Sequence, residues 1–144
     1  MGIDTARLND HMLVRMEPAD RKRLGKNGRT KSDALQDETR KLERAIHDQF
    51  TSFCKRNDII VWHSNPVRKA SIRTGLPDFL CWRNGKALGI EFKVFPNALS
   101  PEQKDMFQEC FQCGNTVHVC EESPSNNAYA QAIMLIAEFF ELGT

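Results

Sequence analysis

The chain has 144 residues, of which 40% are hydrophobic and 27% are charged, and this length and balance fit one globular domain with a single core. No apolar run approaches the roughly 20 residues of a membrane-spanning helix, and the residues after Met1 lack the basic-then-apolar order of a signal peptide, so we expect a cytoplasmic protein without membrane contact. The net charge of +1 hides an asymmetry, with +6 over residues 1–73 and −5 over residues 74–144, and a basic first half is typical either of contact with a polyanion or of a solvated surface.

Residues 1–32 are predicted to form a poorly ordered basic arm. The segment from Arg21 to Lys31 is rich in Lys, Arg, Gly and Asn and has almost no apolar anchors. It is either a flexible arm that tracks phosphates or an inert solvated tail. The remaining residues, 33–144, are expected to form the single folded domain.

The first long helix is predicted over Ser32–Arg56, with Ser32 as its N-cap. Apolar and neutral residues recur in it at helical spacing: Leu35, Leu42, Ala45, Ile46, Gln49, Phe50 and Phe53. A β-branched and aromatic strand follows at Ile59–Trp62. The next loop, Ser64–Thr74, carries three cations, which contact phosphate or lie in a solvated loop: Arg68, Lys69 and Arg73.

A hairpin is predicted over Leu76–Phe95, because Asn84-Gly85 is a strong signal for a two-residue type I′ turn. Ser100-Pro101-Glu102-Gln103 then opens a helix, with Ser as N-cap, Pro at the first position and Gln at the third. Gly114 is expected to end that helix.

The C-terminal part is predicted to hold a short strand over Thr116–Cys120, a polar loop over residues 121–127 and a last helix over Asn127–Leu142. The apolar stripe of that helix belongs either to the core or to a dimer interface. The element order is therefore α-β-β-β-α-β-α, a mixed α/β layer fold.

The hairpin places two carboxylates opposite each other. With Asn84-Gly85 as the turn, Asp78 pairs with Glu91, and a non-hydrogen-bonded pair of this kind has Cβ atoms roughly 4.5–5.5 Å apart. Two like charges at that distance are destabilising, and a divalent cation would remove the conflict, because carboxylate oxygens are preferred ligands of Mg²⁺.

Alternation along the strand puts Lys93 on the face of Glu91, while the opposite face reads as the core side. The core-side residues are Phe79, Cys81, Leu88, Ile90 and Phe92. Ala87 and Gly89 have small side chains, so the carboxylate face has room for a ligand or another element. The alternative is an ordinary polar strand face. A metal here would polarise a phosphodiester and activate water, and Lys93 would orient that water, assist its deprotonation or stabilise the pentavalent transition state.

At these residues the sequence resembles the VRR-NUC family of the PD-(D/E)XK nucleases. Gly75-Leu76-Pro77-Asp78, then Glu91-Phe92-Lys93, then Ser100 to Gln103 and Gly114 stand in the order of that family's pattern, over about residues 40–120. Archaeal-type Holliday-junction resolvases share much of the pattern. The resemblance implies a restriction-endonuclease-like α-β-β-β-α-β core plus a C-terminal helix, Mg²⁺ or Mn²⁺ dependence, DNA cleavage, a homodimer and selectivity for branched or junction DNA.

The resemblance also implies a glutamate from the first helix. Glu43 is the best match and Glu38 the fallback; either is otherwise a surface residue. Gln103 is an active-site residue, part of a capping box, or both. The expected catalytic residues are Asp78, Glu91, Lys93, Glu43 and Gln103. The expected metal residues are Glu43, Asp78, Glu91 and Phe92. The expected DNA-binding residues are Arg68, Lys69, Arg73 and His63.

The cysteines and histidines add no further site. The Cys110-x-x-Cys113 pair is either a zinc motif or part of a set of five free thiols, and no second pair accompanies it. The four histidines show no metal-ligand spacing, and each is interpreted as an ordinary surface or satisfied histidine, with phosphate contact as the alternative for His63 at a strand end near the basic loop.

Three functions compete on these observations. The first is an active Mg²⁺- or Mn²⁺-dependent endodeoxyribonuclease, which the intact Asp78, Glu91 and Lys93 favour. The second is a non-catalytic nucleic-acid-binding module, and the third is a protein-interaction module on a nuclease fold.

Overall fold

The structure is a computed structural model that describes residues 31–64 and 74–143. The chain divides into two compact units between Leu42 and Glu43, inside helix α3 (Lys31–Arg56). The second unit holds residues 43–56 of α3, the whole sheet and the two later helices. All of the contacts described below lie within the second unit.

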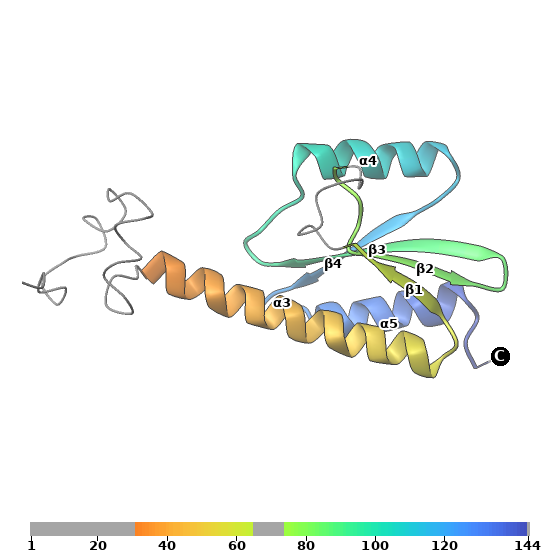
Figure 1. Cartoon of the computed structure of the whole chain (residues 1–144), viewed down its shortest axis with the longest axis horizontal. Coiled ribbons are helices and arrows are strands. Elements are labelled where there is room, and N and C mark those ends of the chain that lie inside the picture. The colour runs from red at the N-terminus through yellow and green to blue at the C-terminus, as the bar shows by residue number, and fades with distance from the viewer. Residues whose placement is uncertain (1–30, 65–73, 144) are drawn as a thin grey trace, which may run out of the picture. The chain divides into compact units, whose positions relative to one another are not determined.

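The second unit is built on a four-stranded mixed sheet in the order β1-β2-β3-β4. Strand β1 (Ile60–His63) pairs antiparallel with β2 (Phe79–Arg83), which pairs antiparallel with β3 (Lys86–Val94); β4 (Val117–Glu122) is parallel to β3. Helix α4 (Pro101–Gln112) covers one face, and residues 43–56 of α3 cover the other together with α5 (Ala128–Phe139) (Figure 1). The predicted α-β-β-β-α-β-α order and the mixed sheet flanked by helices are confirmed.

The β2–β3 hairpin has the predicted turn and register. Asn84 and Gly85 both have positive φ, 51° and 76°, as a type I′ turn requires. Paired residues run from Arg83 opposite Lys86 to Phe79 opposite Ile90. The ladder stops at that pair, so Asp78 lies one residue before β2 and meets Glu91 through side-chain hydrogen bonds.

The core lies between the sheet and the two helices α3 and α5. Its sheet residues include the five predicted for the core side, Phe79, Cys81, Leu88, Ile90 and Phe92. Helix α3 contributes residues at four-residue spacing: Ile46, Phe50 and Cys54. Helix α5 and its C-cap contribute Ala128, Ala132, Ile136 and Phe140, which confirms the core interpretation of the last helix.

The predicted apolar stripe of the first helix is wrong at its N-terminal end. Leu35 is 62% exposed and Leu42 is 43% exposed, and the buried stripe starts at Ile46. Helical spacing marks the side of a helix but not how far along it the core extends. Leu35 and Leu42 belong to the first unit, whereas the core is formed within the second.

Several boundaries differ from the predicted ones by a few residues. Ser32 lies inside the first turn of α3, because the helix already includes Lys31. Strand β4 extends through Glu122, so the predicted polar loop loses its first two residues. The sheet hydrogen bonds of β4 override the polar composition there.

Three of the cysteines, Cys54, Cys81 and Cys120, are buried free thiols, as expected for small hydrophobic residues. Cys110 is half-buried and Cys113 is exposed, and no third potential ligand joins this pair among the residues that the structure describes. The zinc interpretation therefore gains no support. None of the described helices combines the length and the apolar character that crossing a bilayer requires.

Candidate active site

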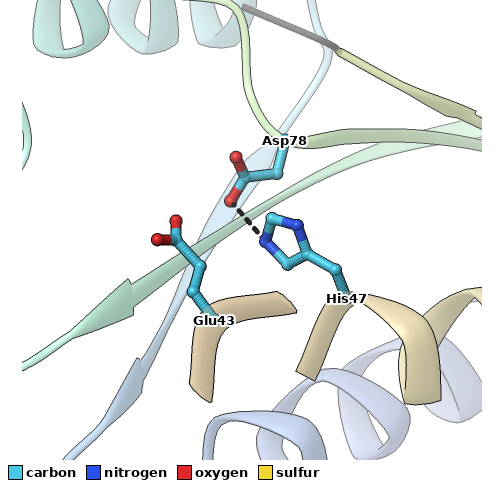
Figure 2. A group of neighbouring side chains, drawn as sticks. All are labelled: Glu43, His47 and Asp78. Atoms are coloured by element: carbon cyan, nitrogen blue, oxygen red, sulfur yellow. Dashed lines mark ion pairs between the residues drawn. The ribbon is translucent and has the colours of Figure 1, made fainter. Parts of the chain in front are cut away.

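Glu43, His47 and Asp78 form a compact group of potential metal ligands (Figure 2). Glu43 and His47 are four residues apart on α3, so their side chains project from the same side of the helix. One potential ligand atom from each of the three residues lies within 4.8 Å of the others. Of the two glutamates considered for this role, Glu43 belongs to the group, whereas Glu38 does not.

The His47 imidazole is oriented toward Asp78 but is not satisfied by it. His47 Nε2 lies 3.4 Å from Asp78 Oδ2, yet this nitrogen is buried and forms no hydrogen bond. A buried polar atom without a partner costs roughly 1–3 kcal/mol, so its presence calls for an explanation. One imidazole and two carboxylates are a suitable ligand set for a divalent cation, and the residues present therefore fit such an ion.

Two crossed hydrogen bonds join the Asp78 segment to the strand that carries Glu91 and Phe92. The Asp78 backbone N–H donates to Glu91 Oε2 over 2.9 Å, and the Phe92 backbone N–H donates to Asp78 Oδ2 over 2.8 Å. Each carboxylate therefore accepts a hydrogen bond from the backbone of the opposite segment. This arrangement keeps the predicted alignment of Asp78 with Glu91 where the strand ladder has already ended.

Glu91 faces α4 rather than the group on α3. Glu91 is 1% exposed. Its Oε1 lies 2.8 Å from Lys93 Nζ and accepts a hydrogen bond of 2.6 Å from Gln103 Nε2. Burial raises the pKa of Glu91, the negative charge of Asp78 raises it further, and Lys93 opposes both effects. Buried Glu91 and half-buried Lys93 thus form an ion pair beside the Glu43–His47–Asp78 group.

Gln103 forms the capping box that was considered for it and also contacts Glu91. Its Oε1 accepts from the Ser100 backbone N–H over 3.0 Å, and its own backbone N–H donates to Ser100 Oγ over 3.1 Å, which completes the capping box of α4. Its Nε2 remains available and donates to Glu91. The two ends of one amide therefore connect the start of a helix to a buried carboxylate.

The segment before Asp78 is fixed from two sides. Gly75 has φ +90°, and a Cβ placed there would meet the Glu102 carbonyl oxygen and come within 2.7 Å of its carbon and 3.1 Å of Gln103 N. On the other side, Ser64 Oγ donates to the Pro77 carbonyl oxygen and Ser64 N to the Asp78 carbonyl oxygen, each over 2.8 Å. The backbone that carries Asp78 is therefore packed against α4 and bound to the end of β1.

The space over Gly89 is filled by side chains of other elements, which was one of the two expected possibilities. A Cβ at this position would lie 2.9 Å from Val117 Cγ2 and 3.3 Å from Pro77 Cγ. The small residue admits neighbouring side chains rather than a ligand. Side chains of other protein segments therefore occupy the space for which a ligand or another element was expected.

His63 lies next to the ligand group but is poorly suited to act as a cation. Its ring stacks on Phe79 with centroids 4.5 Å apart and an interplanar angle of 12°, and it touches the His47 ring edge-on at 4.9 Å. Burial lowers the pKa of His63, His47 lowers it further, and Asp78 opposes the shift. Near neutral pH His63 can therefore offer phosphate a hydrogen bond rather than a full charge. The other expected DNA-binding residues, Arg68, Lys69 and Arg73, lie outside the described residues.

His47 is the residue of this group that the sequence did not predict. It was interpreted as an ordinary histidine, because no second histidine or cysteine stands at a metal-ligand spacing from it. The available signal was the four-residue spacing from Glu43, which puts a carboxylate and an imidazole on one helix face.

The mixed sheet thus carries a buried glutamate, a half-buried aspartate and a lysine close together, next to a group of potential metal ligands. The VRR-NUC domain profile matches residues 15–124, which is 110 of the 144 residues, and the chain belongs to this family. The match starts well before residue 40, where the resemblance was expected to begin, and it ends before α5, as expected. The search of curated proteins and the search of solved structures each returned no match. The family makes this a nuclease-type domain, with DNA as its implied partner and a divalent metal ion as its implied cofactor.

Proposed function

We propose that this protein is a metal-dependent DNA endonuclease that hydrolyses phosphodiester bonds and selects branched or junction DNA by its structure. The observation that carries the proposal is the position of Asp78. Its carboxylate borders the Glu43–His47 ligand pair and also accepts a hydrogen bond from the backbone of the Glu91-Phe92-Lys93 strand. A group of potential metal ligands and an ion pair between a buried carboxylate and Lys93 therefore meet at one residue.

Glu43 and Asp78 are proposed to hold a Mg²⁺ or Mn²⁺ ion, with Glu91 and Phe92 as further metal residues beside them. When bound, the ion supplies Lewis acidity to the phosphodiester and lowers the pKa of water. The remaining contributions come from the side chains of this chain. Glu91 holds Lys93 Nζ at 2.8 Å, in position to donate to an attacking water or to the charge that develops on a phosphoryl oxygen.

Gln103 is proposed to position Glu91 rather than to contact the reacting atoms. Its hydrogen bond fixes the carboxylate from the side of α4, while the Asp78 N–H fixes it from the opposite segment. A buried carboxylate held by three donors keeps one orientation. The Lys93 ammonium is then held in one position before the reaction begins, and electrostatic catalysis requires such preorganisation.

The test is a cleavage panel on single-stranded, duplex, flap and four-way-junction DNA, with Mg²⁺, Mn²⁺ or EDTA. We expect cleavage of branched substrates with metal and none with EDTA. Asp78→Asn should lower the cleavage rate by about 100-fold or more, because it weakens the cation group. The matched control Asp105→Asn, on the exposed side of α4, should cleave like the wild type.

The same panel separates the competing functions. Unchanged cleavage by Asp78→Asn would contradict the proposed site. Wild-type protein that binds DNA but never cuts it would be a non-catalytic nucleic-acid-binding module, and protein that does neither would be a protein-interaction module. The homodimer implied by the resemblance is checked by the mass of the protein in solution with and without DNA.

A further inference from the structure

We infer that His47 Nε2 is a metal ligand in this chain, together with Glu43 and Asp78, and that this nitrogen makes the site select Mn²⁺ over Mg²⁺. The inference rests on the divalent-cation site of the proposed function and deepens it. It concerns which ion the site takes, a question that the carboxylates alone leave open.

The first support is the placement of the three ligand atoms. Glu43 and His47 project from one side of α3, and Asp78 approaches them from the segment before β2 (Figure 2). The three atoms lie within 4.8 Å of one another, which is compatible with a shared ion after small side-chain adjustments. The contributing segments are anchored, since α3 packs through Ile46 and Phe50 and the segment of Asp78 is bound by Ser64.

The second support is the condition of the imidazole itself. A charge-assisted hydrogen bond between a protonated histidine and a carboxylate spans about 2.7–2.9 Å. The observed His47 Nε2 to Asp78 Oδ2 separation is 3.4 Å and the two atoms form no hydrogen bond, although Nε2 is buried. The ion pair drawn in Figure 2 leaves the buried nitrogen without a hydrogen-bond partner, whereas coordination of a metal ion would supply a partner.

The third support is the packing around the ring. The His47 ring lies against three other rings, with centroid distances of 4.9 Å to His63, 5.1 Å to Phe79 and 5.5 Å to Phe92. Two of these neighbours are fully buried core residues. The ring is therefore held in one orientation before any ion arrives, which reduces the entropy lost on binding.

The choice of ion follows from ligand chemistry. Mg²⁺ prefers oxygen ligands and keeps much of its water shell, whereas an imidazole nitrogen favours first-row transition-metal ions. A ligand set of two carboxylates and one imidazole should bind Mn²⁺ more tightly than Mg²⁺. Replacing the nitrogen ligand by an oxygen ligand should remove most of that preference.

The experiment measures metal binding without DNA. Free Mn²⁺ is followed by its electron paramagnetic resonance signal in titrations of the wild type, His47→Ala and His47→Asp, and Mg²⁺ is then added as competitor. We expect His47→Ala to weaken Mn²⁺ binding at least about tenfold and Mg²⁺ binding much less. His47→Asp should recover Mg²⁺ binding but not the Mn²⁺ preference. His118→Ala, an imidazole outside the ligand group, should behave like the wild type.

The outcomes distinguish this inference from the proposed function. If Asp78→Asn and Glu43→Gln lose Mn²⁺ while His47→Ala and His47→Asp keep wild-type Mn²⁺/Mg²⁺ selectivity, the role of His47 is wrong and the nuclease proposal stands. If the wild type cuts DNA but none of these substitutions changes Mn²⁺ binding, the ion sits elsewhere and the inference is also wrong. If the wild type binds neither ion and cuts nothing, both proposals fail. Circular dichroism of each variant shows whether it is folded, and His47→Asp provides a second folded test should His47→Ala be unstable.

Discussion

Glu91 is a buried acid whose charge is balanced by only a few groups. Its carboxylate lies beside Lys93 and accepts hydrogen bonds from Gln103 and from the Asp78 backbone. These partners favour the charged form, but burial and the nearby Asp78 outweigh them, and the pKa of Glu91 is raised. Holding this carboxylate ionised therefore lowers the stability of the metal-free fold.

The raised pKa of Glu91 predicts a specific pH dependence. As pH rises from the unfolded value of about 4.3 through the higher folded pKa, the folded protein binds more protons than the unfolded chain, so the free energy of unfolding falls. Glu91→Gln lacks this contribution. The free energy of unfolding of this variant, relative to the wild type, should increase with pH between the unfolded and the folded pKa of Glu91 and level off above the folded pKa. Urea titrations with EDTA at a series of pH values measure this difference.

Glu91→Gln also loses the ion pair with Lys93, and this loss changes the stability of the variant at any single pH. The informative quantity is therefore the slope of the stability difference and not its sign at one pH. A difference that stays constant from pH 4 to pH 8 would contradict the raised pKa of Glu91.

At the scale of an element, the first turn of α4 couples helix capping to the site. Ser100 and Gln103 close the capping box, and the same Gln103 side chain reaches Glu91. An N-cap contributes about 1 kcal/mol to stability, whereas an oriented buried carboxylate affects the chemistry. The two contributions can be separated, because they use different atoms of one amide.

Gln103→Glu keeps a carboxylate oxygen for the capping box but removes the donor to Glu91 and brings a second negative charge toward it. We expect cleavage to fall about tenfold or more. Ser100→Ala removes the cap hydroxyl instead, and it should lower the free energy of unfolding by about 1 kcal/mol with a smaller effect on cleavage. Rates measured well below each melting temperature test this, and equal rate losses in the two variants would refute the separation.

At the scale of the whole molecule, charge is distributed unevenly along the chain. Residues 1–73 carry 16 Lys and Arg against 10 Asp and Glu, and residues 74–144 carry 4 against 9. The carboxylates of the site repel DNA phosphates. DNA can approach the site only if cations elsewhere in the protein offset this repulsion. The loop between β1 and the Asp78 segment carries three cations within the ten residues that precede Asp78.

Replacing Arg68, Lys69 and Arg73 together by Ala should weaken DNA binding and flatten its dependence on salt. Each lost phosphate contact removes about 0.9 from the slope of log K against log salt, so the triple variant should lose about 2–3. Lys86→Ala is the matched control, because Lys86 Nζ already donates to the Phe139 carbonyl oxygen over 3.3 Å. Binding isotherms at several salt concentrations with EDTA give both slopes, and identical slopes would exclude this loop as a phosphate contact.

The sequence predicted the parts of the fold that depend on local pattern. Asn84-Gly85 determined the hairpin turn, and the turn determined the register that aligns Asp78 with Glu91. Ser100 and Gln103 predicted the capping box. These features follow from a few neighbouring residues, and the family pattern added the order of the elements.

The features that the sequence did not predict depend on how elements pack. His47 becomes a potential ligand only because α3 lies across the end of β2, where Asp78 approaches it. The sequence left open whether a ligand or another element occupies the space over Gly89, because the choice depends on Pro77 and Val117, which reach it from two other segments. The end of the apolar stripe at Ile46 depends on where the core stops, and helical periodicity contains no information about that.

Gly75 has one further consequence, which concerns genetic suppression. The atoms that exclude a methyl group there belong to the backbone of Glu102 and Gln103, not to their side chains. No amino-acid replacement at those two positions removes these backbone atoms, so none can make room for alanine at position 75. A second-site suppressor of Gly75→Ala would have to move α4 or the backbone of residue 75, and either movement would disturb the packing that holds Gln103 and Asp78 next to Glu91.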